Sequence, residues 1–277
     1  MTRGVSWAAV LALATVGCDD VPRTIATARP VSTDPANKSA SQITPEKAPD
    51  KSDPKAVEVV AAAVAAHTGG KPALLQQFKT VQYVREGKIR PGGSAPTDQK
   101  WEVHAAWPDR FRIRAEMPGP STGIAAWTDH GGWRKGGAID KTPMTPAEFK
   151  DMQLESTGEW LLFLFPLTEP GAVLAPVAEV KVGDRPADGV RVWHPRLSDA
   201  IAYFDRETKL LVRLTYDGRE GGRKVNKDVR VLGLKEFAGV KLPERTAYKI
   251  DGVEIAEWTT TAVEPKAQLD SKLFEEP

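Results

Sequence analysis

The stretch WEVHAAWPDRFRIRAEM, residues 101–117, contains the pattern that decides the fold. On both sides of Pro108-Asp109, apolar side chains alternate with polar or charged ones at every second position. Successive side chains of a strand point to opposite faces of a sheet, so this period of two predicts a β-hairpin with one apolar and one charged face. The apolar set is Trp101, Val103, Ala105, Trp107, Phe111, Ile113, Ala115 and Met117.

Further strands are predicted wherever the same period of two recurs. They are expected at residues 79–90, 123–127, 178–182, 190–194, 200–203 and 210–216. The last of these is expected to present Leu210, Val212, Leu214 and Tyr216 on one face. The segment GDRPADG, residues 183–189, is expected to be a loop between two strands, and Asp251-Gly252 is typical of a tight turn. Together these segments predict a long antiparallel meander.

An opening helix is predicted between Asp53 and Gly69. Asp53 is a suitable N-cap, Pro54 favours the first helical turn, and Gly69 favours a left-handed end. The apolar stripe of this helix is expected to contain Val57, Val60 and Val64. A shorter helix is expected at residues 72–78.

The most apolar stretch outside the N-terminus is GEWLLFLFPLTEPG, residues 158–171. It is too short for a membrane span, which needs about twenty apolar residues. Thr145 and Glu148 upstream have the spacing of a capping box, so a helix is expected from there toward Phe165, weakened at Gly158. We expect this helix to lie on the apolar face of the sheet.

The composition is that of a globular protein. Of 277 residues, 41% are hydrophobic and 27% charged, which is sufficient for one sizeable core. The net charge is +1, from 38 basic and 37 acidic residues without a basic block, so nucleic acid is excluded as an expected partner. The single cysteine, Cys18, excludes an intrachain disulfide and a multi-cysteine zinc site.

Residues 1–18, MTRGVSWAAVLALATVGC, have the pattern of an export signal. Arg3 precedes an apolar run over residues 5–16, and small residues precede Cys18. The end TVGC resembles the bacterial lipobox, although Thr15 stands where leucine is preferred. This resemblance implies lipid attachment at Cys18 and anchoring to a membrane surface. The alternative is an ordinary secretory signal with an incidental cysteine.

Residues 19–55 are rich in proline, serine, threonine and alanine and contain no aromatic residue. Such a segment buries too little apolar surface to offset its ordering entropy, so a disordered tether is expected. The predicted organisation is therefore a lipoprotein signal peptide (1–18), a tether (19–55) and one folded domain (56–277). The expected location is the bacterial cell envelope, facing the periplasm.

Several segments of residues 56–277 resemble the lipoprotein-sorting proteins of the LolA/LolB type. They are AAHTGG, EVKVGDRPADGVRVWHP, AYFDRETKLLVRLTYDG, LKEFAGVKLPERTAYKIDG and LDSKLF. The resemblance implies an α+β, mainly antiparallel β fold: a strongly curved, incomplete β-barrel with helices packed over its concave face. In the best-known members the cavity receives the acyl chains of lipoproteins, and related folds sense envelope stress.

The apolar side chains of the predicted sheet and covering helix form the expected ligand site, for a lipid or a lipoprotein acyl chain. The residues are Trp101, Val103, Trp107, Phe111, Ile113, Met117, Trp127, Trp160, Phe163, Leu164 and Phe165. The alternative is that sheet and helix pack tightly and leave no cavity. Both alternatives are consistent with the sequence.

No catalytic residue, metal site or cofactor is predicted. The four histidines share no metal-binding motif, and His67 is expected in the last turn of a helix, where it complements the dipole. Asp129-His130, the segment 205–207 and GREGGR at 218–223 are expected to be turns.

The expected function is therefore non-catalytic binding and release of an apolar ligand. One alternative is an envelope sensor or scaffold that binds a partner protein through its sheet edge. The weakest alternative is a hydrolase, because no nucleophile motif is present.

Overall fold

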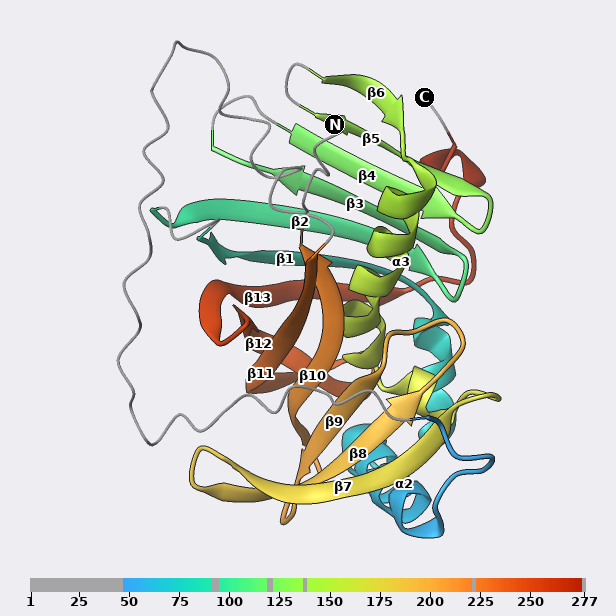
Figure 1. The fold of residues 1–277 in the computed structure, drawn as a ribbon, viewed down its shortest axis with the longest axis vertical. Coiled ribbons are helices and arrows are strands. Elements are labelled where there is room, and N and C mark those ends of the chain that lie inside the picture. Colours follow the sequence, from blue (N-terminus) through green and yellow to red (C-terminus); the bar gives the residue numbers. More distant parts are fainter. Residues whose placement is uncertain (1–46, 91–94, 119–121, 137–138, 221–222, 276–277) are drawn as a thin grey trace.

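The computed structural model describes residues 47–90, 95–118, 122–136, 139–220 and 223–275. In this part of the chain thirteen antiparallel strands form one sheet, in the order β6-β5-β4-β3-β2-β1-β13-β12-β11-β10-β9-β8-β7 (Figure 1). The strands are β1 Thr80–Ile89, β2 Thr97–Ala106, β3 Arg110–Glu116, β4 Thr122–Thr128, β5 Gly131–Gly136, β6 Ile139–Pro143, β7 Val173–Val182, β8 Arg185–Trp193, β9 Ala200–Asp205, β10 Leu211–Glu220, β11 Arg223–Phe237, β12 Val240–Ile250 and β13 Val253–Pro265. The helices are α2 Pro54–Thr68 and α3 Pro146–Leu161, with 3-10 helices η2 Pro72–Lys79, η4 Phe165–Thr168 and η5 Ser271–Leu273.

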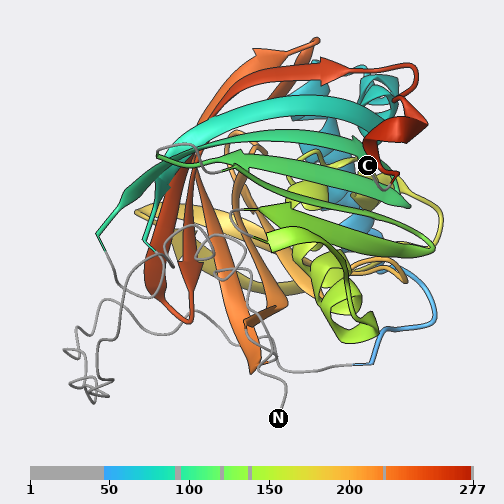
Figure 2. The same cartoon turned by 90° about the horizontal axis from the view of Figure 1, so that it is seen from above.

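The sheet is strongly curved and remains open, with β6 and β7 as its two edges (Figure 2). Consecutive strands pair throughout, except β6 and β7, which lie at opposite edges of the sheet. The two halves of the meander are joined where β1 pairs with β13. Helix α3 lies across the concave face (Figure 1). The predicted fold class, a half-open antiparallel barrel with a helix over its concave face, is confirmed.

The hairpin at residues 101–117 is confirmed as β2 and β3. Val103 pairs with Ile113 and both are buried, whereas Glu102 and Arg114 lie opposite each other on the outer face. The alternation of the sequence thus places the apolar side chains inside the curve. Asp251 and Gly252 both have positive φ, as the predicted tight turn between β12 and β13 requires.

The predicted loop at residues 183–189 is wrong. The turn contains only Gly183 and Asp184, because β8 begins at Arg185, which pairs with Val182. Gly189 lies within the strand, where a Cβ atom would come within 2.4 Å of Val177. Glycine is therefore needed at this position because the Val177 side chain comes close to the backbone, not because the chain turns there.

Two predicted core positions are also wrong. Val212 lies on the outer face, because a bulge between Leu211 and Arg213 shifts the alternation of β10. Val57 is 46% exposed, because α2 packs on the sheet through its alanines as well as Val60 and Val64.

The ends of α2 are fixed as predicted. The Asp53 side chain accepts a hydrogen bond from the amide of Lys55, and Gly69 has the left-handed conformation at the other end. The amide of Asp53 also donates to the carbonyl of Leu174 in β7, so contacts with the sheet begin before residue 56. Cys18, the signal peptide and most of the predicted tether lie outside the described residues. No helix in the described ranges is long and apolar enough to cross a membrane.

His67 attaches the C-terminal end of α2 to two strands. Its Nδ1 donates to the carbonyl of Lys241 in β12, and its Nε2 accepts a hydrogen bond of 2.9 Å from the amide of Leu211. Burial lowers the pKa of His67, so the ring is neutral at neutral pH. The predicted position in the last turn is correct, but a neutral, hydrogen-bonded ring replaces the expected interaction with the helix dipole.

Helix α3 begins with the predicted capping box. Thr145 accepts a hydrogen bond from the amide of Glu148, whose side chain accepts one from the amide of Thr145. The helix runs without a break through Gly158 and ends at Leu161, four residues before the predicted end at Phe165. The chain then reverses at Leu164, a buried residue with a φ of 64°, and enters η4.

We expect the stability of the fold to fall as the pH is lowered through the range of histidine titration. The unfolded histidine binds a proton near pH 6.5, whereas folded His67 resists it, so its contribution is fully present above that pH and is lost below it. His67→Gln should lose about 2 kcal/mol at neutral pH, because two buried hydrogen bonds are disturbed. Urea unfolding of both proteins across this pH range tests the expectation, and equally steep pH dependence in the variant would contradict it.

Candidate functional site

Ten of the eleven residues predicted to line a ligand site come together on the concave face and its cover, whereas Met117 follows the end of β3 and does not belong to this core. Nine of the eleven are buried in one core, and Trp107 and Met117 are half-buried. The buried ones are Trp101, Val103, Phe111, Ile113, Trp127, Trp160, Phe163, Leu164 and Phe165. The sequence therefore identified side chains that share one space, although they come from strands, α3 and the segment after it.

These side chains contact one another ring to ring. The ring of Trp160 on α3 lies 5.2 Å from that of Trp107 and 5.9 Å from that of Phe111, and Phe111 stacks on Trp127 at 4.5 Å. Phe165 completes the group at 5.6 Å from Trp107. Phe163 belongs to the same buried core, but its ring contacts those of Phe78 and Tyr83. We call Trp107, Phe111, Trp127, Trp160, Phe163 and Phe165 the aromatic cluster. The rings of this cluster occupy the space between the sheet and its cover, which consists of α3 and the segment after it.

Four carboxylates form a stripe along α3. They lie at positions 148, 151, 155 and 159, a spacing that places them on one face of a helix. Each pairs with a cation of a different strand, so α3 is attached across the sheet by charge. The pairs are Glu148–Arg134 of β5 (3.0 Å), Asp151–Arg219 of β10 (3.4 Å), Glu155–Lys227 of β11 (3.0 Å) and Glu159–Arg85 of β1 (2.7 Å). We call the four carboxylates the acidic stripe.

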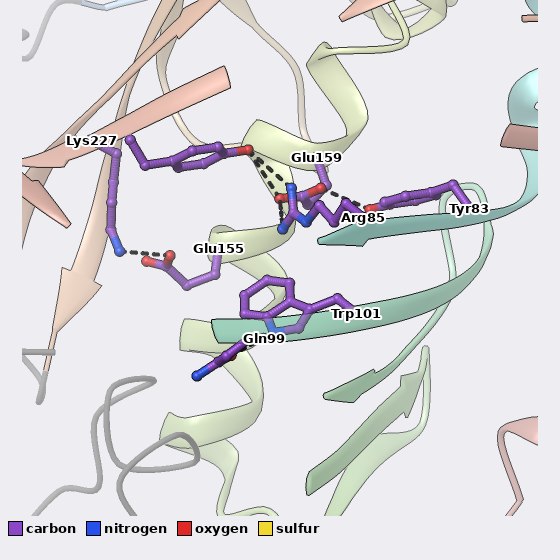
Figure 3. Close-up of polar contacts among 8 residues, drawn as sticks. Tyr83, Arg85, Gln99, Trp101, Glu155, Glu159 and Lys227 are labelled. Carbon is purple, nitrogen blue, oxygen red and sulfur yellow. Dashed lines mark hydrogen bonds and ion pairs between the residues drawn. The ribbon is translucent and has the colours of Figure 1, made fainter. Parts of the chain in front are cut away.

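The innermost pair, Glu159 and Arg85, is the centre of a buried polar group (Figure 3). The Glu159 carboxylate accepts hydrogen bonds from Arg85 Nη2 at 2.7 Å, from the Tyr83 hydroxyl at 2.8 Å and from the Tyr248 hydroxyl at 3.2 Å. Three donors from two strands thus converge on one carboxylate. Arg85 is only 4% exposed, and its Nε is buried without a hydrogen-bond partner among the described residues.

Aromatic rings surround the Arg85 guanidinium. Its central carbon lies 4.6 Å from the ring centre of Trp101 and 4.8 Å from that of Trp258. Such cation–π contacts favour the charged form of the side chain. Trp101 was predicted to contact an apolar ligand, but in the structure it contacts this cation, and its indole nitrogen donates to Gln99 (Figure 3).

The charge states of this group are well defined. Burial disfavours the charge of Arg85, but Glu159 together with Tyr248 and Tyr83 more than offsets it, so the pKa of the guanidinium is raised. Burial and then Glu159 raise the pKa of both Tyr83 and Tyr248 above that of free tyrosine. At neutral pH the two phenols therefore remain protonated and donate hydrogen bonds to Glu159.

Tyr83 joins the polar group to the aromatic cluster. Its hydroxyl binds Glu159, and its ring lies 5.4 Å from that of Phe163. The concave face thus has a charged region around Arg85 and an apolar region directly beside it. Glu159 and Trp160, consecutive on α3, cover one region each.

Sequence analysis did not predict Arg85, Glu159 or Lys227 as site residues, yet two signals were present. Arg85 lies two residues after Tyr83 and four after Val81, so all three side chains face the same side of β1 and a cation lies on an otherwise apolar face. The carboxylates of α3 repeat at intervals of three and four residues. Both signals indicate a paired interior charge, but neither identifies the partner.

A cleft of about 370 Å³ opens beside the aromatic cluster. Half-buried Trp107 lines it and also contacts Trp160 of the cover, so the cleft ends at the edge of the covered space. An ion pair between Lys79 and Glu169, at 2.9 Å, lies at the same place. The lining residues are Lys79, Trp107, Pro108, Glu169, Pro170, His194, Pro195 and Arg196.

The other motifs are structural. Asp129 and His130 lie at the tip between β4 and β5 and are exposed, and Asp205 accepts hydrogen bonds from the amides of Glu207 and Thr208 in a turn. The predicted loop at GREGGR is too long, because residues 218–220 belong to β10 and Arg223 belongs to β11, where it pairs with Glu220. Residues 221–222 lie outside the described ranges. Among the residues that the structure covers, no group of three histidine, cysteine or acidic side chains is placed to hold a metal ion.

No family model matches the chain, and no curated protein matches its sequence. Solved structures do match. A LolA superfamily protein from Nitrosomonas europaea aligns with 76% of this chain and 98% of its own length, at a TM-score of 0.50 and 8% sequence identity. The chain has the LolA fold. The resemblance inferred from the sequence segments is confirmed at this level.

Two other solved structures with this fold are less similar. A domain assigned to the outer membrane lipoprotein-sorting proteins, from Vibrio parahaemolyticus, has a TM-score of 0.48 over 79% of this chain and 96% of its own length, at 9% identity. A DUF1329 family protein from Desulfovibrio piger has a TM-score of 0.47 over 79% and 97%, at 11% identity. At such identities the LolA fold says nothing specific about activity, which depends on the site.

Gly158→Ala should weaken the attachment of α3, although alanine is the better helix former by about 1 kcal/mol. A Cβ atom at Gly158 would lie 2.6 Å from the hydroxyl of buried Tyr216, so the helix has to move away from β10. Overpacking of this kind costs about 1–3 kcal/mol. Thermal or urea unfolding measures the loss, with Lys150→Ala on the exposed face of α3 as the control. A more stable Gly158→Ala variant would show that α3 does not press against the sheet.

Proposed function

We propose that this protein binds an apolar chain, of a lipid or a lipoprotein, between the concave face of its sheet and α3, and releases it without chemical change. The proposal depends mainly on one observation: α3 covers apolar side chains, yet ion pairs to four different strands contribute to its attachment. Figure 3 shows two of these attachments, Glu155 with Lys227 and Glu159 with Arg85. The helix in this proposal is a removable cover.

The buried side of α3 differs from that of a permanent core helix. It includes Ser156, Thr157 and Gly158 between Met152 and Trp160. Half-exposed ion pairs such as Asp151–Arg219 contribute about 1 kcal/mol or less, so they hold α3 only weakly. The buried Glu159–Arg85 pair differs, because opening separates it and leaves Arg85 in need of another anion. With polar residues on its buried side, α3 otherwise costs less to move than a helix with a continuous apolar face.

Affinity for the ligand would come from the aromatic cluster. Each methylene group buried against these rings contributes about 0.8 kcal/mol, so a long acyl chain supplies enough free energy to replace the contacts of α3 and η4. The ligand would enter at the cleft beside Trp107, which borders this region and would connect to it when α3 moves. We propose that the eleven side chains predicted from the sequence, apart from Trp101 beside Arg85 and Met117 outside the core, line the bound chain.

The proposal includes the N-terminal organisation inferred from the sequence. Residues 1–18 would direct export, and Cys18 would carry the lipid. The segment between Cys18 and Ser52, where contacts with β7 begin, would hold the domain at a distance from the membrane surface. The protein would then act in the bacterial envelope as a carrier or receptor, with no catalytic residue and no cofactor.

Binding of a partner protein at a sheet edge is the second candidate, and the open edge at β7 favours it. However, Pro176 in β7 lacks an amide donor, and Glu179 and Lys181 are exposed charges on the same strand. These are features by which edge strands resist pairing. We therefore place the ligand site on the concave face.

The full chain should bind the methyl ester of a fluorescent fatty acid in a saturable manner. Because the ester carries no charge, its binding reports the apolar site alone. Hydrogen exchange should show that amides of α3 lose protection on binding while those of β1 and β13 keep it. Failure of the ester to bind, or unchanged protection in α3, would overturn the proposal.

Asp151→Asn should increase the association rate of the ester about two- to fivefold. The Asp151–Arg219 pair is half-exposed, so its removal changes stability by less than about 1 kcal/mol and mainly loosens the cover. Glu116→Gln, which removes an exposed carboxylate paired with Arg114 on the outer face, is the matched control and should leave the rate unchanged.

A further inference from the structure

The position of Glu159 has the features of a receptor for a carboxylate. Two phenol hydroxyls and a guanidinium donate to this one group, and all three donors belong to the sheet (β1 and β12). Only the acceptor belongs to α3. When the cover moves, the donors remain on the concave face and the carboxylate leaves.

Once α3 has moved away, an Arg85 without an anionic partner is energetically unfavourable. The guanidinium is 4% exposed, lies against the adjacent rings of Trp101 and Trp258, and cannot be deprotonated at physiological pH. A neutral ligand that displaces α3 would leave this charge without an anionic partner. An anionic ligand would restore the partner.

Arg85 also has an unused donor. Its Nε is buried and makes no hydrogen bond within the described residues, while Nη2 binds Glu159 and Nη1 binds the Tyr248 hydroxyl at 3.3 Å. A carboxylate that is free of the helix backbone could approach both Nε and Nη2, the bidentate geometry that Arg favours. The site therefore has a stronger binding mode than the one Glu159 uses.

We propose that the ligand is a long-chain acid, whose carboxylate takes the place of Glu159 at Arg85, Tyr83 and Tyr248. This inference rests on the proposed function, because it requires α3 to move, and it adds the chemical class of the ligand. Glu159 is then an internal mimic of the ligand head group. It closes the empty protein and is exchanged when the ligand binds.

The hydrocarbon chain has a defined direction in this arrangement. Tyr83 contacts Glu159 through its hydroxyl and Phe163 through its ring, so the head-group site borders the aromatic cluster. A single chain that starts at Arg85 would extend along Phe163 toward Trp160 and Phe111. The cleft beside Trp107 lies at the far end of this path.

The test compares a fluorescent fatty acid, such as cis-parinaric acid, with its methyl ester on the full chain. The two probes share the hydrocarbon chain and differ in the head-group charge. We expect the acid to bind about tenfold tighter or more, because charge-assisted hydrogen bonds replace those of Glu159. Arg85→Gln should abolish this preference and should not weaken ester binding, because the neutral ester has no use for the charge and no longer leaves it unpaired.

Two further variants keep the test independent of folding. Arg85→Gln combined with Glu159→Gln removes both interior charges, so no uncompensated charge remains, and it should bind acid and ester equally. Glu159→Gln alone should bind the acid several-fold tighter than the native chain, because the competing carboxylate is gone. Arg114→Gln, an outer-face change with a similar loss of charge, should retain the native preference.

The outcomes separate the two proposals. The native chain could bind acid and ester with equal affinity, or the preference for the acid could survive in Arg85→Gln. Either result overturns the proposal that the ligand is a long-chain acid and leaves the proposed binding of an apolar chain intact. Binding of neither probe overturns both. A preference for the acid that disappears only with Arg85 supports both.

Discussion

A charged guanidinium on the concave face constrains how this sheet can be covered. Arg85 lies among aromatic rings with almost no access to water, so each arrangement of the protein has to supply an anion beside it. In the closed arrangement Glu159 supplies it and thereby fixes the position of α3 along the sheet. The other three pairs of the acidic stripe follow from that register, because their carboxylates lie on the same helical face.

The ion pairs of the cover depend on particular side chains, whereas the fold does not. A curved antiparallel sheet under a helix is an architecture shared with a distant protein, and the fold alone does not identify a ligand. The interior cations and the carboxylates that pair with them come from this sequence. In the proposed function the apolar region would supply affinity and the charged region selectivity.

The fold could be predicted from the sequence wherever apolar residues recur at a regular period or a local capping motif marks the end of a helix. Thus the hairpin around Pro108, the caps of α2 and the capping box of α3 were found, since each depends on neighbours within a few residues. Val212 was misplaced because the bulge in β10 depends on its pairing with β9. Gly189 was misplaced because the glycine makes room for the side chain of Val177, which is twelve residues away in the sequence. The apolar half of the candidate site was predicted from the alternation, whereas Arg85, Glu159 and Lys227 were missed because an ion pair across 74 or 72 residues has no local signature.

The reversal of the chain at Leu164 adds a mechanical property to the cover. A leucine in the left-handed region is disfavoured by about 1–2 kcal/mol, and the surrounding core holds it there with a φ of 64°. In the proposed opening, movement of α3 and η4 would allow this torsion to relax. The relaxation would return part of the free energy needed to move the cover.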